Sequence, residues 1–358
     1  MSDFTYRDDL KVAKFPAPVG SKRKIVFDYY MKMATAEWTP KENFLLTHSP
    51  DVPREYTLEL QHKAGKKYFG IPYGNTRANL DEFLEHVQNN VFSCDSYYYT
   101  DIVGNHCSSS MFFAYQQIIP VGYGTFRPSE ERKGLFSLTG NLKNPGEGKW
   151  YSSTVFELNG EEAVYEAFAA LEKSDILFKC IPGSGHVRMV SKVETVRDEN
   201  GKIDPEKSYV YVVEHTNLWF TDEQVSSWYI DKKRKFTTLF KTGFMPITAD
   251  IFHNNTPITD AYMFYDGKNN AETIKYGING NIKSNYPLNY LLLTIKDKNN
   301  KVVKKIHVRN VPEIFEFDLE KECSELDLSD LNKGTYEFKL RTSIARGGYN
   351  FEKFTFTI

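Results

Sequence analysis

The sequence predicts an α+β protein of two domains: a mixed helix-and-strand domain over residues 1–248 and an all-β, immunoglobulin-like sandwich over residues 249–358. Three observations lead to this prediction. The chain has 358 residues, more than a single domain of about 150 residues needs. Apolar residues recur at helical spacing only in the first half of the chain. Beyond residue 249, short apolar runs alternate with polar turns, which is typical of a sandwich.

Four helices are expected in the mixed domain. Residues 22–38 and 80–87 carry apolar side chains at three- and four-residue intervals, and Asn79 is a candidate N-cap of the second helix. Cys107 begins a buried helix, and another runs over about residues 161–173. Successive short strands separated by turns are expected at residues 175–178, 187–193, 209–213 and 235–240.

The sandwich is expected to consist of short strands of regular spacing. Polar turns such as residues 297–300 and 332–334 separate them. The expected strands are residues 261–264, 288–295, 302–308, 314–317, 336–340 and 351–356.

Composition argues against several classes of function. Lysine and arginine number 45 and aspartate and glutamate 47, so a formal net charge of −2 gives no reason to expect a nucleic-acid partner. The longest apolar runs are far shorter than the roughly 18 residues of a membrane span, so no span is expected. Cys94, His106 and Cys107 match no common zinc spacing, and neither a metal nor a cofactor is expected. The residues give no indication of oligomeric state.

Cys107 is the candidate nucleophile. The unpaired N–H groups and the dipole of a helix N-terminus favour a thiolate at such a position. A thiol nucleophile also needs a base, and His186, which opens a strand after the turn at residues 182–185, is the leading candidate. A third polar group has to orient that imidazole, and the next strand offers Glu214 and His215. Because side chains alternate along a strand, only one of the two can face His186, and the pattern does not decide which.

The order of these motifs resembles the NlpC-like cell-wall peptidases of the papain-like superfamily. The resemblance covers roughly residues 22–245 and implies a papain-like fold, in which the helix of Cys107 packs on an antiparallel sheet that carries His186. It also implies hydrolysis of amide bonds in bacterial peptidoglycan stem peptides, commonly after a γ-linked D-glutamyl residue. The motifs that carry it are Ile71-Pro72-Tyr73-Gly74, His106-Cys107-Ser108-Ser109, Asp175-Ile176-Leu177-Phe178 and Gly185-His186-Val187.

Carried over to this chain, the resemblance makes Cys107 the nucleophile, His186 the general base and Tyr73 a hydroxyl near the oxyanion. Glu214 is the preferred orienting group, with His215 as the alternative. The resemblance also implies a secreted or cell-envelope protein. The first ten residues lack the apolar centre of a secretory signal, so a cytoplasmic location stays open.

The chain departs from the family pattern at several positions. His106 stands where the family usually has Asp, and Ser174 and Arg188 stand where Gly is common. His106 and Arg188 favour an alternative function, in which a catalytically inactive protein on the same scaffold binds cell-wall or glycan ligands. A third interpretation is an acyl or amide transferase that uses the same thiolate. A thiol pKa well below about 8.5 at Cys107 would favour catalysis over the inactive binder.

Overall fold

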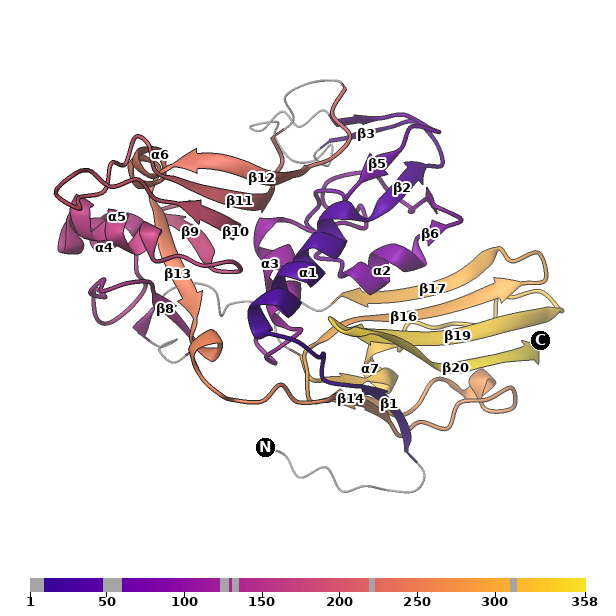
Figure 1. Ribbon diagram of the computed structural model, residues 1–358. Coiled ribbons are helices and arrows are strands. Elements are labelled where there is room, and N and C mark those ends of the chain that lie inside the picture. Colours follow the sequence, from indigo (N-terminus) through magenta and orange to yellow (C-terminus); the bar gives the residue numbers. More distant parts are fainter. Residues whose placement is uncertain (1–9, 48–59, 123–128, 131–134, 219–222, 310–313) are drawn as a thin grey trace. The chain divides into compact units, whose positions relative to one another are not determined.

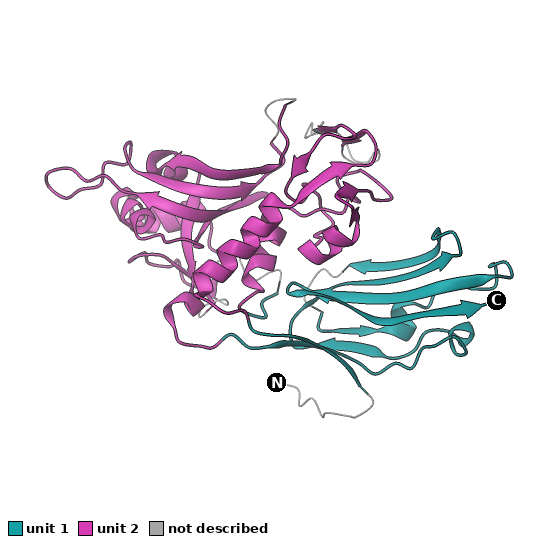
Figure 2. Ribbon diagram, turned by 45° about the vertical axis from the view of Figure 1, so that its right-hand side comes forward, with its two compact units in different colours: residues 1–17, 119–122, 258–358 teal, residues 18–118, 123–257 magenta. Residues whose placement is uncertain are grey.

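The computed structural model describes residues 10–47, 60–122, 129–130, 135–218, 223–309 and 314–358 (Figure 1). The chain divides into two compact units (Figure 2). Unit 1 comprises residues 1–17, 119–122 and 258–358, and unit 2 comprises residues 18–118 and 123–257. This division differs from a single boundary at residue 248, because strand β1 (Lys11–Phe15) pairs with β14 (Ala261–Tyr265) and so belongs to the C-terminal sheet.

Unit 2 is built on a six-stranded antiparallel sheet of strand order β12-β11-β10-β9-β13-β8. Consecutive residues such as Met189 and Val190, or Val212 and Val213, are buried, so both faces of the sheet are covered at its centre. The strands are β8 (Phe136–Leu138), β9 (Ile176–Ile181), β10 (Ser184–Glu194), β11 (Tyr209–His215), β12 (Trp228–Lys235) and β13 (Phe244–Ala249).

Helices α1 (Lys22–Thr35) and α3 (Cys107–Tyr115) pack on each other, and α3 contacts β10 and β11 (Figure 1). Every residue of α3 from Ser109 onward is buried, which agrees with the expectation of a buried helix that begins at Cys107. Helix α5 (Glu161–Ala169) contacts β10, β13 and α6 (Phe236–Lys241), and α4 (Ser152–Asn159) contacts β9.

The prediction of a strand at residues 235–240 is wrong, because most of this segment forms helix α6. Phe236, Leu239 and Phe240 lie three and four residues apart, which is helical spacing. Phe236 packs edge-on against Phe168 of α5, with ring centroids 5.5 Å apart. Helix α4 precedes α5 and was not expected from the sequence.

A small subdomain of unit 2 surrounds Trp38. The Trp38 ring lies 5.2 Å from Tyr68 and 5.0 Å from Phe92, in a cluster of buried aromatic side chains. Asn79 caps α2 (Leu80–Glu85), since its side chain accepts a hydrogen bond from the Glu82 backbone N–H at 2.8 Å, as expected. The strands here are β2 (Glu37–Pro40), β3 (Phe44–Leu46), β4 (Leu60–His62), β5 (Tyr68–Phe69), β6 (Val87–Gln88) and β7 (Val91–Phe92).

Unit 1 contains two four-stranded antiparallel sheets, of order β1-β14-β15-β18 and β17-β16-β19-β20. Side chains of both sheets, among them Met263 and Ile282 of the first and Leu293 and Phe338 of the second, form one core. The α+β arrangement with antiparallel sheets is therefore confirmed. The remaining elements of unit 1 are β15 (Asn281–Ser284), β16 (Leu288–Asp297), β17 (Val302–Arg309), β18 (Glu316–Asp318), β19 (Thr335–Ile344), β20 (Gly347–Thr357), α7 (Leu319–Glu322) and the 3₁₀ turn η4 (Ile274–Tyr276).

Candidate functional site

Two glycine-containing segments bring Tyr73 beside the start of α3. Tyr73 and Asn105 form a parallel bridge, and the Asn105 N–H donates to the Pro72 carbonyl at 3.1 Å. A Cβ atom at Gly104 would lie 2.5 Å from that Pro72 oxygen, so only glycine allows the approach. The Ile71-Pro72-Tyr73-Gly74 turn is thereby fixed next to Cys107.

His106 caps the helix of Cys107. Its ring Nδ1 accepts from the Ser109 backbone N–H at 3.5 Å, and the Ser109 hydroxyl accepts from the His106 backbone N–H at 3.0 Å, which completes a capping box. Burial and the nearby positive charge of Arg77 lower the pKa of His106 to about 4. A neutral imidazole therefore serves as the hydrogen-bond acceptor at the N-cap of α3.

The Cys107 thiol is partly exposed and surrounded by hydrogen-bond donors. The backbone N–H of Val187, the Tyr73 hydroxyl and the backbone N–H of Ser108 each act on the sulfur in the direction that favours a thiolate. Burial outweighs these donors and raises the pKa of the Cys107 thiol. The helix N-terminus alone thus does not give the low thiol pKa expected from the sequence.

His215 is held between aromatic rings and fully buried. Its ring stacks on Trp228 with centroids 4.1 Å apart, meets Tyr73 edge-on at 4.9 Å, and its Nε2 is 2.9 Å from the Ser227 hydroxyl. Within the described part of the chain, its Nδ1 has no hydrogen-bond partner. Burial, with smaller contributions from His106 and His186, moves the pKa of His215 well below its ordinary value.

Glu214 points to the other face of the sheet and binds two arginines. Its carboxylate forms ion pairs with Arg188 and with Arg234, the latter at 2.8 Å. Burial disfavours the charged form, but Arg188, Arg234 and His186 together lower the pKa of Glu214. Both carboxylate oxygens are thus engaged by arginine, which differs from the expected role of orienting the His186 ring.

His186 is partly exposed and lies two residues before Arg188, on the same face as Glu214. Its ring packs edge-on against Phe244 at 6.2 Å. Burial lowers the pKa of His186 to about 4, and the positive charges of Arg188 and Arg234 add to this while Glu214 opposes it. Among the described residues, no hydrogen bond joins the His186 ring to Cys107 or Glu214.

The structure thus places the Tyr73 hydroxyl and the Val187 backbone N–H near the Cys107 sulfur, and His186 is the residue that precedes Val187. Glu214 and His215 face opposite sides of β11, as strand alternation requires. Sequence reasoning missed the Val187 N–H and the two arginines on Glu214. Arg188 was noted in the sequence only as a departure from Gly, and nothing in the pattern linked it to Glu214.

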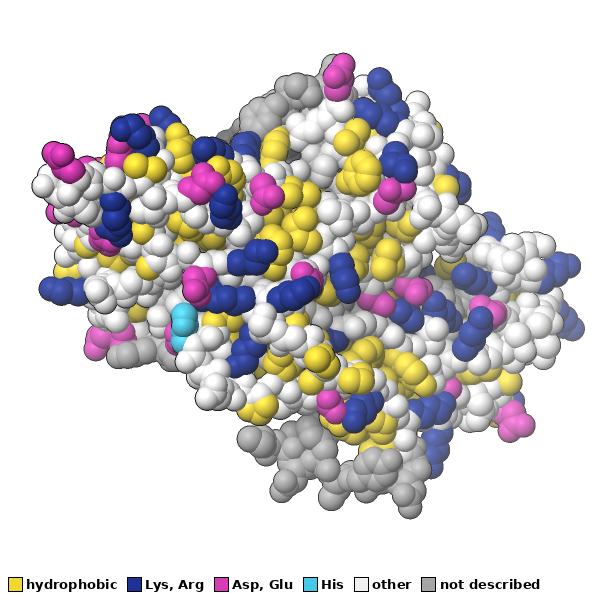
Figure 3. All heavy atoms as spheres, viewed as in Figure 1, with side chains coloured by type: hydrophobic (Ala, Val, Ile, Leu, Met, Phe, Trp, Pro, Cys, Tyr) yellow, Lys and Arg dark blue, Asp and Glu magenta, His cyan; other side chains and the backbone are white. Residues whose placement is uncertain are grey.

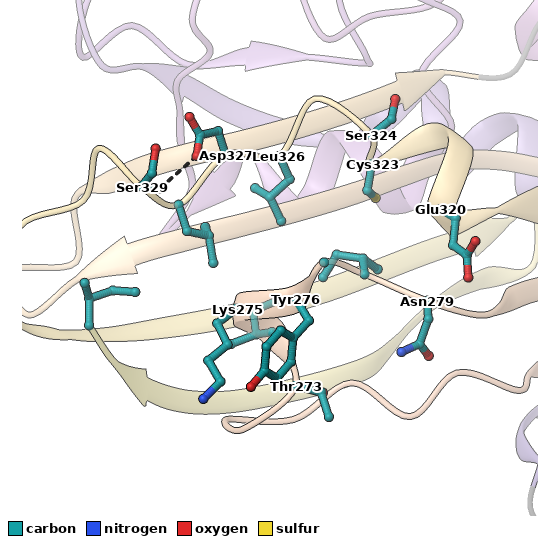
Figure 4. A pocket seen from close by; sticks show the side chains of 15 residues that line it. Thr273, Lys275, Tyr276, Asn279, Glu320, Cys323, Ser324, Leu326, Asp327 and Ser329 are labelled. Carbon is teal, nitrogen blue, oxygen red and sulfur yellow. Dashed lines mark hydrogen bonds between the residues drawn. The ribbon is translucent and has the colours of Figure 1, made fainter.

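A separate broad hollow of about 1010 Å³ lies in unit 1 (Figure 4). The η4 segment with Lys275 and Tyr276 lines it together with α7 and the turn that follows, including Glu320 and Asp327. Tyr276 is 82% exposed, an unusual state for an aromatic side chain.

Acidic and basic side chains are interspersed on the face that Figure 3 shows, in keeping with the formal net charge of −2. In the described ranges, no group of three or more His, Cys, Asp or Glu side chains could hold a metal ion. No helix among the described residues has the length and apolarity of a membrane span. Comparisons of the chain with family models, with curated proteins and with solved structures find no match.

Proposed function

We propose that this protein is a cysteine amidohydrolase of papain-like type that cleaves amide bonds in peptidoglycan stem peptides. The observation that carries the proposal is the set of donors around the Cys107 sulfur, namely the Tyr73 hydroxyl and the Val187 backbone N–H, at a helix N-terminus. Acyl transfer to a thiol requires hydrogen-bond donors and an imidazole near the sulfur. The raised pKa of the Cys107 thiol favours the inactive binder instead, and the cleavage test below decides between the two.

In the acylation step, the Cys107 thiol gives its proton to an imidazole, and the sulfur attacks the amide carbonyl carbon. A C–S bond forms while the carbonyl oxygen gains negative charge, which the Tyr73 hydroxyl and backbone N–H groups at the start of α3 stabilise. The imidazolium then protonates the nitrogen of the leaving amine, and the C–N bond breaks.

In the deacylation step, the neutral imidazole takes a proton from water, and the resulting oxygen nucleophile attacks the thioester. The C–S bond breaks, the acid product leaves, and the proton returns to the Cys107 sulfur. Both steps need an imidazole that is neutral at the start of each step. The lowered pKa values of His186 and His215 provide this at neutral pH.

His186 is the better candidate for the base. It is partly exposed, so its ring can approach both the sulfur and a leaving amine, and catalytic hydrogen bonds are often absent until substrate binds. His215 is fully buried, and Ser227 already occupies its Nε2. We therefore assign His215 a positioning role toward Tyr73, whose ring it contacts.

The test is cleavage of defined stem peptides by the purified protein, followed by mass spectrometry. We expect Cys107→Ala to lose essentially all turnover, and Cys94→Ala, which removes another partly exposed thiol, to retain it. We expect His186→Ala to lose far more turnover than His215→Asn. Stem-peptide cleavage by the Cys107→Ala protein would overturn the proposal.

A second candidate function is binding of cell-wall glycan by unit 1. The exposed ring of Tyr276 stands beside polar and charged side chains in the hollow of Figure 4, a combination that suits a sugar ring with its hydroxyl groups. Co-sedimentation with purified peptidoglycan tests this. Tyr276→Ala should reduce the bound fraction, whereas replacement of the exposed Tyr349 by Ala should leave it unchanged.

A further inference from the structure

Two buried tryptophans hold the main chain that leads to Tyr73. The indole N–H of Trp38 donates to the Gly70 carbonyl at 2.8 Å, and the indole N–H of Trp228 donates to the next carbonyl, that of Ile71, at 2.9 Å. The backbone N–H groups of the same two residues donate to carbonyls at the C-terminal end of α1, at 2.7 and 3.0 Å. The segment before Tyr73 is therefore held by hydrogen bonds on both sides.

The backbone at Gly70 makes room for the Trp228 ring. Gly70 has a φ of +76°, and a Cβ atom at this position would lie 2.2 Å from Cδ1 of Trp228. Glycine is therefore required both by the backbone conformation and by the close approach of the indole. Trp228 is only 5% exposed, so water cannot readily replace the hydrogen bond to Ile71 if it is lost.

The Trp228 ring also supports Tyr73 through His215. Trp228 and His215 lie directly opposite each other on β12 and β11, and their rings stack with centroids 4.1 Å apart and planes 9° apart. The His215 ring in turn meets the Tyr73 ring edge-on at 4.9 Å. One indole thus supports the main chain before Tyr73 and, through a second ring, its side chain.

The Tyr73 hydroxyl is one of the donors at the Cys107 sulfur. Such a donor stabilises developing charge best when it is held in place before the reaction begins. We propose that Trp228 is a positioning residue that holds the Tyr73 hydroxyl at the Cys107 sulfur. Its hydrogen bond to Ile71 fixes the main chain, and its stack on His215 fixes the ring. The role of Trp228 in catalysis rests on the proposed function, but its effect on the sulfur can be measured without substrate.

The test measures the pKa of the Cys107 thiol from the pH dependence of iodoacetamide labelling, followed by mass spectrometry of the peptide that contains Cys107. Tyr73→Phe should raise this pKa by about 1 to 2, the effect of losing one hydrogen bond to a charged acceptor. Trp228→Phe should raise it by part of that amount and should have no further effect in the Tyr73→Phe background. A residue that only stabilises the fold would not show this dependence on the Tyr73 hydroxyl.

Trp150→Phe is the matched control. Trp150 is 3% exposed and its indole N–H donates to the Gly146 carbonyl at 2.8 Å, so this variant loses an indole hydrogen bond elsewhere in unit 2. We expect it to leave the pKa of the Cys107 thiol unchanged. If Trp228→Phe does not fold, 3-benzothienylalanine at position 228 removes the N–H and keeps the shape of the ring, and the same comparison is made with it.

An unchanged thiol pKa in the folded Trp228 variant, or in Tyr73→Phe, overturns the proposal. So does an equal rise with and without the Tyr73 hydroxyl, or an equal rise in Trp150→Phe. The proposed function is decided separately by cleavage of stem peptides. A protein that shows the expected dependence but cleaves no stem peptide would retain the positioning of Tyr73 by Trp228 and lose the proposed function.

Discussion

The two faces of strands β10 and β11 hold their histidines in opposite surroundings. On one face, His215 lies between the rings of Trp228 and Tyr73 and is neutral because it is buried. On the other, His186 lies beside an ionic cluster formed by Glu214 and two arginines, and burial together with the arginines keeps it neutral. Consecutive residues of a strand face opposite sides, so Glu214 and His215 contribute to different environments.

The comparison of His215 with His186 shows that two different environments near the Cys107 thiol can each keep an imidazole neutral. On the face of Trp228 and Tyr73, the aromatic face, the His215 ring is held rigidly with little room to move. On the face of Glu214, Arg188 and Arg234, the ionic face, the pKa of the His186 ring responds to nearby charge. Because the pKa of the Cys107 thiol is raised, the resting pair is thiol and neutral imidazole. In the proposed reaction, activation of the thiol then has to come with the substrate. The predictions that follow separate the contributions of the two faces.

Removal of the Glu214 side chain is expected to have the largest effect, a loss of unfolding free energy. Glu214→Ala leaves Arg188 and Arg234 without a counter-charge, and breaking a buried pair in this way costs about 3–5 kcal/mol of unfolding free energy. Urea denaturation measures this. The control Glu162→Ala breaks an exposed ion pair with Lys202 and should have little effect. A stable Glu214→Ala protein that has lost turnover would instead support an orienting role for Glu214.

Acid should destabilise the protein through its neutral histidines. The pKa of His106 and of His186 falls to about 4, below the ordinary value of 6.5, so between these pH values the unfolded chain binds protons that the folded chain does not. Stability is therefore fully present above about pH 6.5 and falls as the pH drops toward 4. His106→Asn keeps an N-cap but cannot titrate. It should therefore reduce the loss of unfolding free energy between neutral pH and about pH 4 by about 3 kcal/mol. Urea denaturation at several pH values measures the difference, and an unchanged pH dependence would contradict it.

Tyr73→Phe should lower kcat/KM by about 10²-fold, the usual effect of losing one oxyanion donor. The ring contact with His215 is retained, so the unfolding free energy should change little. Tyr99 stacks on Tyr73 with centroids 5.8 Å apart, and Tyr99→Phe serves as the control. Equal losses in the two variants would indicate that the aromatic face acts through packing and not through the Tyr73 hydroxyl.

The smallest effect is expected at the cap of α3. His106→Ala removes the N-cap and should cost about 1 kcal/mol of unfolding free energy. His106→Asp keeps a cap but places a negative charge beside the sulfur, which should raise the pKa of the Cys107 thiol further. The pH dependence of iodoacetamide labelling measures this pKa. Faster labelling of His106→Asp would show that the neutral cap does not favour the thiolate.

Local patterns predicted much of the fold and the parts of the site that depend on them. The start of α3 at Cys107, the Asn79 cap and most sandwich strands follow from spacing and turn residues close in the sequence. The segment after Lys235 was misassigned because two phenylalanines and a leucine suit a strand as well as a helix until their partner in α5 is known. Glu214 was expected to orient His186, and its pairing with Arg188 and Arg234 was missed because these arginines lie on other positions of the sheet, at long range in the sequence.

Strand β1 has a consequence for the synthesis of the chain. The hydrogen-bonding partners of residues 11–15 are residues 261–265, which are made some 250 residues later. Buried Ala13 shares a core with Met263 and Phe351, so its packing partners are made some 250 or more residues after it. Such non-local pairing slows folding. Residues 11–15 therefore cannot complete their sheet until residues 261–265 have been synthesised.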